Sequence, residues 1–190
     1  MRVPTLENER VKLTLLDLSN YKHLSEIAQQ PNLVQYSPSK IDTTEDLILY
    51  VKNAVECYYQ KSAIPFIIFD KQANMYAGST RFMNINWNYN VLEIGSTWIG
   101  KEFQGTGLNT NMKSLMLEYA FDVLNFEKVE FRIDERNLRS RMAVEKLGSK
   151  LEGVLRKNLY LLDGFKRNSC CYGILKEEWE VNKIDVFKKT

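Results

Sequence analysis

The sequence predicts a single α/β domain built on a mixed β-sheet, and three observations support this. Strand-like and helix-like runs alternate along the 190 residues, and no repeat or Pro/Gly/Ser-rich linker separates them. Three strand-like runs follow one another in the middle of the chain, as in an antiparallel meander. A long amphipathic segment then joins the third run to another strand, which implies parallel pairing across a helical crossover.

The first half of the chain supplies two helices and the meander. Thr43 or Thr44 can cap the second helix, because acidic residues follow in what would be its first turn. The segment NWNYN separates the last two strands and has the composition of a turn. The expected elements are a strand at 11–15, helices at 18–29 and 43–60, and strands at 65–70, 76–84 and 91–99.

The second half supplies the crossover and a closing hairpin. Gly148 marks the end of the second helix in this half. Asp163-Gly164 is a strong hairpin signal between the last two strands. The expected elements are helices at 107–124 and 138–147 and strands at 128–133, 153–162 and 167–175.

The composition is that of an ordinary soluble protein and excludes several classes. A formal net charge of +2 provides no strong field for nucleic acid or a membrane surface. The start, MRVPTLENER, lacks the apolar core of a signal peptide, and no apolar run reaches the ~20 residues that span a bilayer. Three cysteines, two of them adjacent, do not form a disulfide framework. We therefore expect a cytoplasmic protein.

The stretch WIGKEFQGTGLNTNMK at 98–113 carries two glycines between a strand and a helix. A P-loop is excluded because Thr106 and Gly107 stand where its lysine and hydroxyl residue belong. A dinucleotide fingerprint lacks its third glycine. The backbone N–H groups of 104–109 could instead cradle a pyrophosphate at the start of the helix. A plain strand-to-helix turn is the alternative that this stretch alone leaves open.

Two spaced motifs give the sequence a family resemblance. Gln104-Gly105-Thr106-Gly107-Leu108-Asn109 resembles the signature [QR]-x-x-G-x-[GA], with Asn109 departing at the last position. Asn137, Ser140 and Gly148 fit N-x-x-S-x-x-x-x-x-x-x-G, and EGVLR and ILKEEW follow at 152–156 and 174–179. Over about residues 7–180 the chain resembles the GNAT superfamily of N-acetyltransferases, in particular the branch that acetylates the N-termini of ribosomal proteins.

This resemblance implies a fold and a cofactor site. The expected fold is one GNAT-type domain over 1–190, with a mixed, roughly seven-stranded sheet, helices on both faces, and a splay between the fourth and fifth strands. Acetyl-CoA would place its pantetheine in that splay, with its pyrophosphate on the glycine turn and no metal. The residues expected to bind it are Trp98, Ile99, Gln104, Gly105, Thr106, Gly107, Leu108, Asn109, Asn137 and Ser140.

The resemblance also implies direct transfer of an acetyl group to a primary amine. Glu93 is the expected general base, although a solvated strand carboxylate is the ordinary alternative. Period-two alternation predicts that Glu93 faces the same way as Gly95 and Thr97. Ser140 is the expected proton donor to the departing thiolate, with helix capping as its alternative. Positions 157–160 lack the carboxylate that some relatives use as their base.

Several points remain open from the sequence. Tyr172 is a second candidate proton donor, and Lys146 or Arg139 could meet the CoA 3′-phosphate. Trp87 or Tyr89 could line the acceptor pocket, whose ligand is a peptide N-terminus or a small amine. A catalytically silent CoA-binding module is the rival function, and a homodimer is one assembly that the chain could form.

Overall fold

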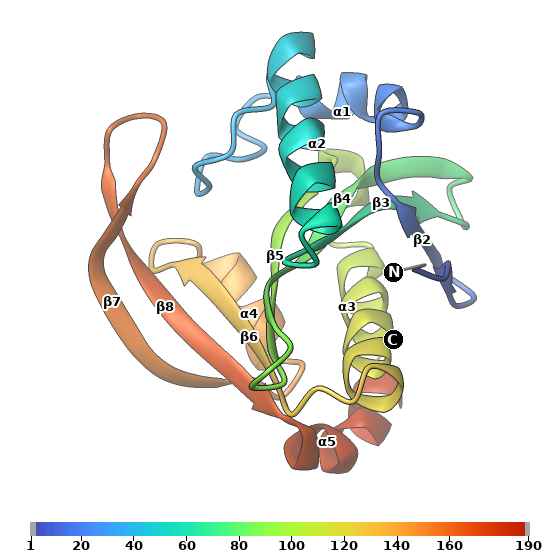
Figure 1. Ribbon diagram of the computed structural model, residues 1–190, viewed down its shortest axis with the longest axis vertical. Helices are drawn as coiled ribbons and strands as arrows, with labels where there is room; N and C mark the ends of the chain where they lie inside the picture. Colours follow the sequence, from blue (N-terminus) through green and yellow to red (C-terminus); the bar gives the residue numbers. More distant parts are fainter. Residues whose placement is uncertain (1–2, 189–190) are drawn as a thin grey trace.

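The computed structural model describes residues 3–188 and places a mixed eight-stranded sheet at their centre (Figure 1). The strand order is β1-β2-β3-β4-β5-β6-β8-β7, antiparallel throughout except for the β5–β6 pair. The strands are β1 (Leu6–Glu7), β2 (Val11–Leu15), β3 (Ile64–Asp70), β4 (Met75–Asn86), β5 (Val91–Ile99), β6 (Lys128–Asp134), β7 (Lys150–Tyr160) and β8 (Lys166–Leu175).

Helices cover both faces of the sheet, as predicted. On one face Met112 and Met116 pack in the main core cluster with Trp179. On the other face Leu47 and Val51 lie in a second cluster. The helices are α1 (Ser25–Ala28), α2 (Thr44–Tyr59), α3 (Leu108–Glu118), α4 (Leu138–Glu145) and α5 (Lys176–Lys188), with short 3-10 segments at Tyr21–Leu24 and Lys101–Phe103 and a π-helical turn at Tyr119–Val123.

Most predicted elements are confirmed to within a few residues, and the differences have simple causes. The helix predicted at 18–29 is only two short segments between Tyr21 and Ala28. Strand β1 brings the sheet to eight strands instead of roughly seven, because two residues are too few to show a period. Helix α5 was not predicted; its sequence is largely charged and has little amphipathic pattern. Gly148 follows α4 with φ +92°, a conformation that glycine adopts readily.

Strands β5 and β6 separate shortly after they begin to pair. Their parallel register runs from Val91–Lys128 to Glu93–Glu130. Beyond that point β5 continues to Ile99 along β4, while β6 continues to Asp134 along β8. The predicted splay is therefore confirmed, and its apex lies at Glu93 and Glu130.

A β-bulge inside β5 reverses which face of the sheet its side chains meet. Ser96 has φ +48°, and the register with β4 shifts across this point. Because a bulge adds one residue, the alternation of faces inverts beyond it. Glu93 contacts Asn84, whereas Thr97 contacts Lys113 of α3 on the opposite face. The prediction that Glu93 and Thr97 face the same way is wrong for this reason.

Candidate active site

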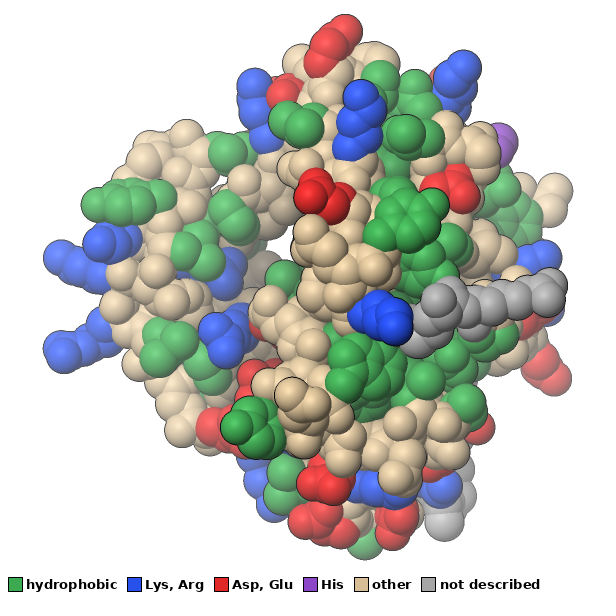
Figure 2. Space-filling model, viewed as in Figure 1, with side chains coloured by type: hydrophobic (Ala, Val, Ile, Leu, Met, Phe, Trp, Pro, Cys, Tyr) green, Lys and Arg blue, Asp and Glu red, His purple; other side chains and the backbone are tan. Residues whose placement is uncertain are grey.

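A cleft of about 860 Å³ occupies the space between the splayed strands. The hollow is visible in Figure 2 between the β7–β8 side of the molecule and the remainder. Its walls come from the loop 32–39, Met83 and Asn84, β5 residues 93–99, the turn 103–105 with Asn109 and Lys113, β6 residues 131–134, the segment 136–140 with Ala143 and Val144, Asn158, Leu159 and Arg167.

The glycine turn has an open backbone, and its residues 103–105 line the cleft. Gly105 and Gly107 have φ +81° and +87°, and a Cβ atom on either would project into open space with no atom within 4 Å. Gly107 is the N-cap of α3, and no side chain caps that helix. The first N–H groups of a helix lack partners within it and carry partial positive charge. The turn therefore fits a phosphate group, which would occupy the space that a Cβ would fill.

Side chains hold the turn in place. The Gln104 amide donates to the carbonyl of Ile99 at 2.8 Å and accepts from the Arg139 guanidinium. The Thr106 hydroxyl donates to the carbonyl of Phe103 at 2.8 Å. Leu108 is fully buried, so only its backbone is available to a ligand. Of the two candidates for the 3′-phosphate, Arg139 lines the cleft and Lys146 does not.

The start of α4 brings Asn137 and Ser140 into the cleft. The Asn137 side chain accepts the backbone N–H of Ser140 at 3.2 Å and so acts as the N-cap. The capping role considered for Ser140 therefore belongs to Asn137. The Ser140 hydroxyl lies on the cleft wall, partly exposed, where it can meet a ligand.

Glu93 is a buried carboxylate at the apex of the cleft, 6% exposed. Burial raises the pKa of its carboxyl, while a hydrogen bond from Asn84 at 2.8 Å and the Arg132 guanidinium at 3.6 Å act in the opposite direction. The solvated carboxylate considered as the alternative is thus excluded. A buried carboxylate with a raised pKa is a stronger base than an exposed one.

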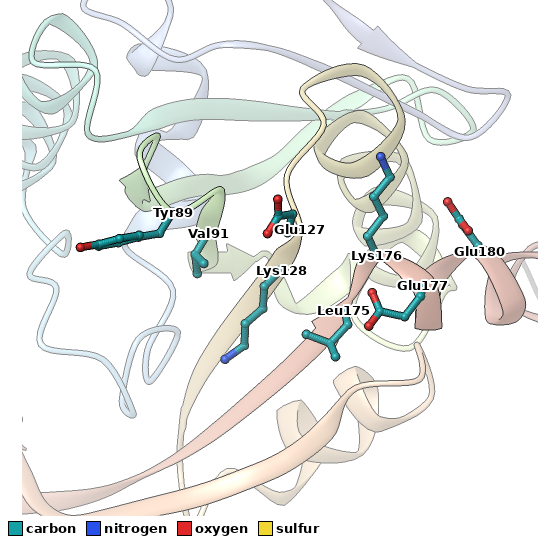
Figure 3. Close-up of a pocket in the computed structure, with 8 residues that line it drawn as sticks. All are labelled: Tyr89, Val91, Glu127, Lys128, Leu175, Lys176, Glu177 and Glu180. Atoms are coloured by element: carbon teal, nitrogen blue, oxygen red, sulfur yellow. The ribbon is translucent and has the colours of Figure 1, made fainter.

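Three aromatic candidates lie outside the cleft. Tyr172 is 1% exposed, and its hydroxyl donates to Glu145 at 2.7 Å within the fold. The Trp87 indole donates to the carbonyl of Lys61 and packs on Phe126. Tyr89 borders a separate surface hollow of about 520 Å³ beside the start of α5, where its ring extends away from the other labelled side chains (Figure 3). The expectation that Trp87 or Tyr89 lines the acceptor pocket is not supported.

Other residues line the cleft that the sequence did not single out. Tyr36 belongs to a loop with no motif, and Asn84 lies at the end of a strand. Arg167 donates to the carbonyl of Tyr36 at 2.7 Å and so ties that loop to β8. Lys113 looks in the sequence like an ordinary polar residue of an amphipathic helix, yet it is 6% exposed and lies within the cleft. Only the packing of distant segments reveals these positions.

Among the residues whose side chains the structure describes, 3–183, no three His, Cys, Asp or Glu side chains form a group that could hold a metal ion. In the same part of the chain, no helix combines the length and apolarity needed to cross a membrane.

Comparisons with known proteins agree with this fold. The chain is 29% identical over 184 residues to "Putative ribosomal N-acetyltransferase YdaF" of Bacillus subtilis (strain 168), covering 93% of this chain and 97% of that protein. A GCN5-related N-acetyltransferase from Brucella melitensis has a similar fold, with a TM-score of 0.87 at 23% identity over 97% of this chain and 84% of that one. Spermidine N-acetyltransferase from Vibrio cholerae, solved with CoA and spermine, gives a TM-score of 0.75 at 19% identity over 91% and 99%.

The family model for the acetyltransferase (GNAT) domain matches residues 10–150, which include the bulged strand, the glycine turn and the start of α4. This match covers most of the chain, and it spans both walls of the splay. The chain therefore belongs to the GNAT family and is an N-acetyltransferase.

Proposed function

We propose that the cleft binds acetyl-CoA and that Glu93 is the base that activates a primary amine for direct acetylation. The observation that carries this proposal is the position of a buried carboxylate at the apex of the splay, with an open glycine cradle at the other end. Acetyl-CoA supplies an activated acetyl group as its thioester. The cleft residues bind it, exclude water and move protons.

Each group has a defined task in this scheme. The backbone of Gln104–Asn109 binds the pyrophosphate, and Arg139 lies near the phosphates of the cofactor. The backbone of Trp98 and Ile99 binds the pantetheine. Glu93 accepts the proton of the acceptor ammonium, directly or through a water, because only the free amine is nucleophilic. Ser140 donates a proton to the thiolate. Asn137 orients Ser140 by capping α4.

The charged residues around Glu93, where the acceptor amine would bind, favour a peptide N-terminus over a polyamine. Asp134 is paired with Arg136 at 2.8 Å, and Arg132 lies beside Glu93 and Glu130. A polyamine carries several cations and needs several unpaired carboxylates, whereas a single amine needs one base. The relatives include proteins named for ribosomal and for spermidine acetylation, and the paired charges favour an acceptor of the first kind.

The test measures thiol release across an amine library that includes peptides and spermidine, beside calorimetry with acetyl-CoA. We expect turnover on peptides and little on spermidine. Tight binding with no turnover on any amine would support the rival function, a silent CoA-binding module. Failure to bind acetyl-CoA would overturn the cleft assignment itself.

Glu93→Gln separates chemistry from binding, because it keeps the shape and removes the base. Turnover is expected to fall ~10²-fold or more while acetyl-CoA affinity is unchanged. Glu127→Gln is the matched control, since Glu127 is exposed beside the separate surface hollow and lies outside the cleft walls. Full activity in Glu93→Gln near neutral pH would assign Glu93 a structural role.

The pH profile gives a second measurement. Because burial raises the pKa of Glu93, the wild-type rate should rise with pH through a midpoint above that of an ordinary glutamate. The same shift means that protonated Glu93 stabilises the fold below its unfolded pKa, and that this stability is lost as pH rises through the folded pKa. Glu93→Gln should therefore not lower the melting temperature at pH 7, which checks that the variant is folded.

The assembly state stays a prediction. Size-exclusion chromatography with light scattering would distinguish a monomer from a homodimer.

A further inference from the structure

Lys113 is a buried lysine that the proposed chemistry does not use. It lies on α3 with its side chain in the cleft, 6% exposed. Its ammonium donates to the Thr97 hydroxyl of β5 at 3.3 Å and lies 5.5 Å from the centre of the Phe131 ring on β6. These two residues stand on opposite walls of the splay, so the Lys113 nitrogen bridges the gap between the separated strands.

The surroundings of this nitrogen contain hydroxyls and an aromatic ring. The Thr97 hydroxyl also forms a hydrogen bond with the Thr80 hydroxyl of β4, at an oxygen–oxygen distance of 2.8 Å. Within the described residues, no carboxylate forms an ion pair with Lys113. Glu93, Arg132 and Glu130 are the charged groups nearest the apex of the splay, and Glu93 faces the opposite side of the sheet. Asp134, also on the cleft wall, is paired with Arg136.

Burial without a counter-ion favours the neutral amine. It lowers the pKa of Lys113 to about 8. Lys113 is then unprotonated in about a tenth of the molecules at pH 7, whereas an ordinary lysine is unprotonated in less than about a thousandth. An amine of this kind is a competent nucleophile at the pH of a cell.

We infer that Lys113 is an internal acceptor, which the enzyme acetylates itself when acetyl-CoA is bound and no amine substrate is present. This inference rests on the proposed function of the cleft as the acetyl-CoA site. An acyl group bound between β5 and β6 has Glu93 on one face of the sheet and Lys113 on the other. The Lys113 nitrogen bonds to the acetyl carbon, the carbon–sulfur bond breaks, and the proton lost by the amine passes to the departing thiolate, giving Nε-acetyl-Lys113 and free CoA.

The modification has a consequence for the cleft. It removes the positive charge and adds a neutral group between Thr97 and Phe131, in the space where pantetheine would lie. The acetylated protein should bind acetyl-CoA several-fold more weakly. Acetylation of Lys113 would therefore lower the activity of the enzyme when amine acceptors are scarce.

The test follows the mass of the intact wild-type protein with acetyl-CoA and no amine, at pH 7, 8 and 9. We expect a gain of one acetyl group per chain, mapped by peptide fragmentation to Lys113, with a rate that rises from pH 7 to about pH 8 and then levels off. A desulfo analogue of CoA in excess should block it. Lys52, exposed on α2, is the internal control: any chemical acetylation there should be slow and indifferent to the analogue.

Variants and parallel assays separate the outcomes. Lys113→Arg keeps the charge and should abolish the modification. Turnover on added amines with Lys113 unmodified would overturn this inference and leave the proposed function standing. Absence of acetyl-CoA binding by calorimetry would overturn both. Loss of acetyl-CoA affinity in Lys113→Arg without any acetylation of the wild-type lysine would also overturn it, and would make Lys113 a binding group only.

Discussion

The N-termini of α2 and α3 differ in whether a side chain caps them. Helix α2 begins after Thr43, whose hydroxyl accepts the N–H of Asp46 at 3.1 Å, and Glu45 and Asp46 follow in its first turn. Helix α3 begins after Gly107, with no capping side chain and no acidic residue in its first turn. Both helices carry the same partial positive charge at this end. A side chain of the protein caps α2, whereas the α3 terminus has no side-chain cap and is the proposed binding site of a ligand.

Under the proposed function, the difference corresponds to local stability given up for binding at α3. A capping side chain and first-turn carboxylates stabilise a helix by about 1 kcal/mol or more together. At α3 a capping side chain would occupy the position proposed for the phosphate, and a carboxylate there would repel the phosphate. Gly107 instead adopts φ +87°, and a Cβ atom at this position would meet no atom within 4 Å. In the proposed function, this uncapped terminus is the phosphate-binding end of the cofactor site.

The largest expected effect comes from filling the α3 cradle. Gly107→Val places a branched side chain where the phosphate would lie, and it strains a backbone at positive φ. Acetyl-CoA affinity should fall by roughly 2–4 kcal/mol, as for one or two lost charge-assisted hydrogen bonds plus steric displacement. Calorimetry measures this loss directly.

Gly164→Val is the matched control for that variant. Gly164 has φ +80° in the turn between β7 and β8, and a Cβ there also meets no atom within 4 Å. The control should lose stability to the same backbone strain but keep its affinity for acetyl-CoA. If both variants bind acetyl-CoA equally well, the cradle is misplaced.

A smaller effect is expected when α3 is made to resemble α2. Asn109→Asp puts a carboxylate of the same shape into the first turn of α3, on the cleft wall. The helix should gain roughly 0.3–1 kcal/mol of stability, because the charge complements the helix N-terminus. Acetyl-CoA affinity should fall by about 1–2 kcal/mol, because the carboxylate faces the phosphates.

Thermal unfolding and calorimetry at low salt measure the two quantities separately for Asn109→Asp. Opposite signs in stability and affinity are the expected result, and both should shrink as salt screens the charges. A variant that is more stable and binds acetyl-CoA as well as the wild type would show that the α3 terminus does not meet an anion.

The smallest effect is expected when α2 is made to resemble α3. Thr43→Ala removes the cap, and the free energy of unfolding should fall by about 1 kcal/mol. Acetyl-CoA affinity should not change, since Thr43 lies outside the cleft walls. Denaturant titration and calorimetry check the two values, and weaker acetyl-CoA binding in this variant would contradict the assignment of α2 to a purely structural role.

The sequence by itself determined the order of most elements and the position of the glycine turn. Thr43 and Asp163-Gly164 act through bonds to residues a few positions away, so local patterns are enough to locate them. The glycine turn has the same character, because its conformation depends on two residues without side chains. Strand β5 was predicted with its observed bounds for the related reason that its alternation is regular until Ser96.

Only the tertiary structure decided which side chains share the cleft. The bulge at Ser96 placed Thr97 on the face opposite Glu93, and a single inserted residue leaves no signal in an alternating pattern. Tyr36, Arg167 and Lys113 come from segments far apart in the chain, and each looks ordinary in its own segment. Lys113 owes its lowered pKa to burial between two separated strands. Burial is set by how the strands and α3 pack together, and local sequence does not encode it.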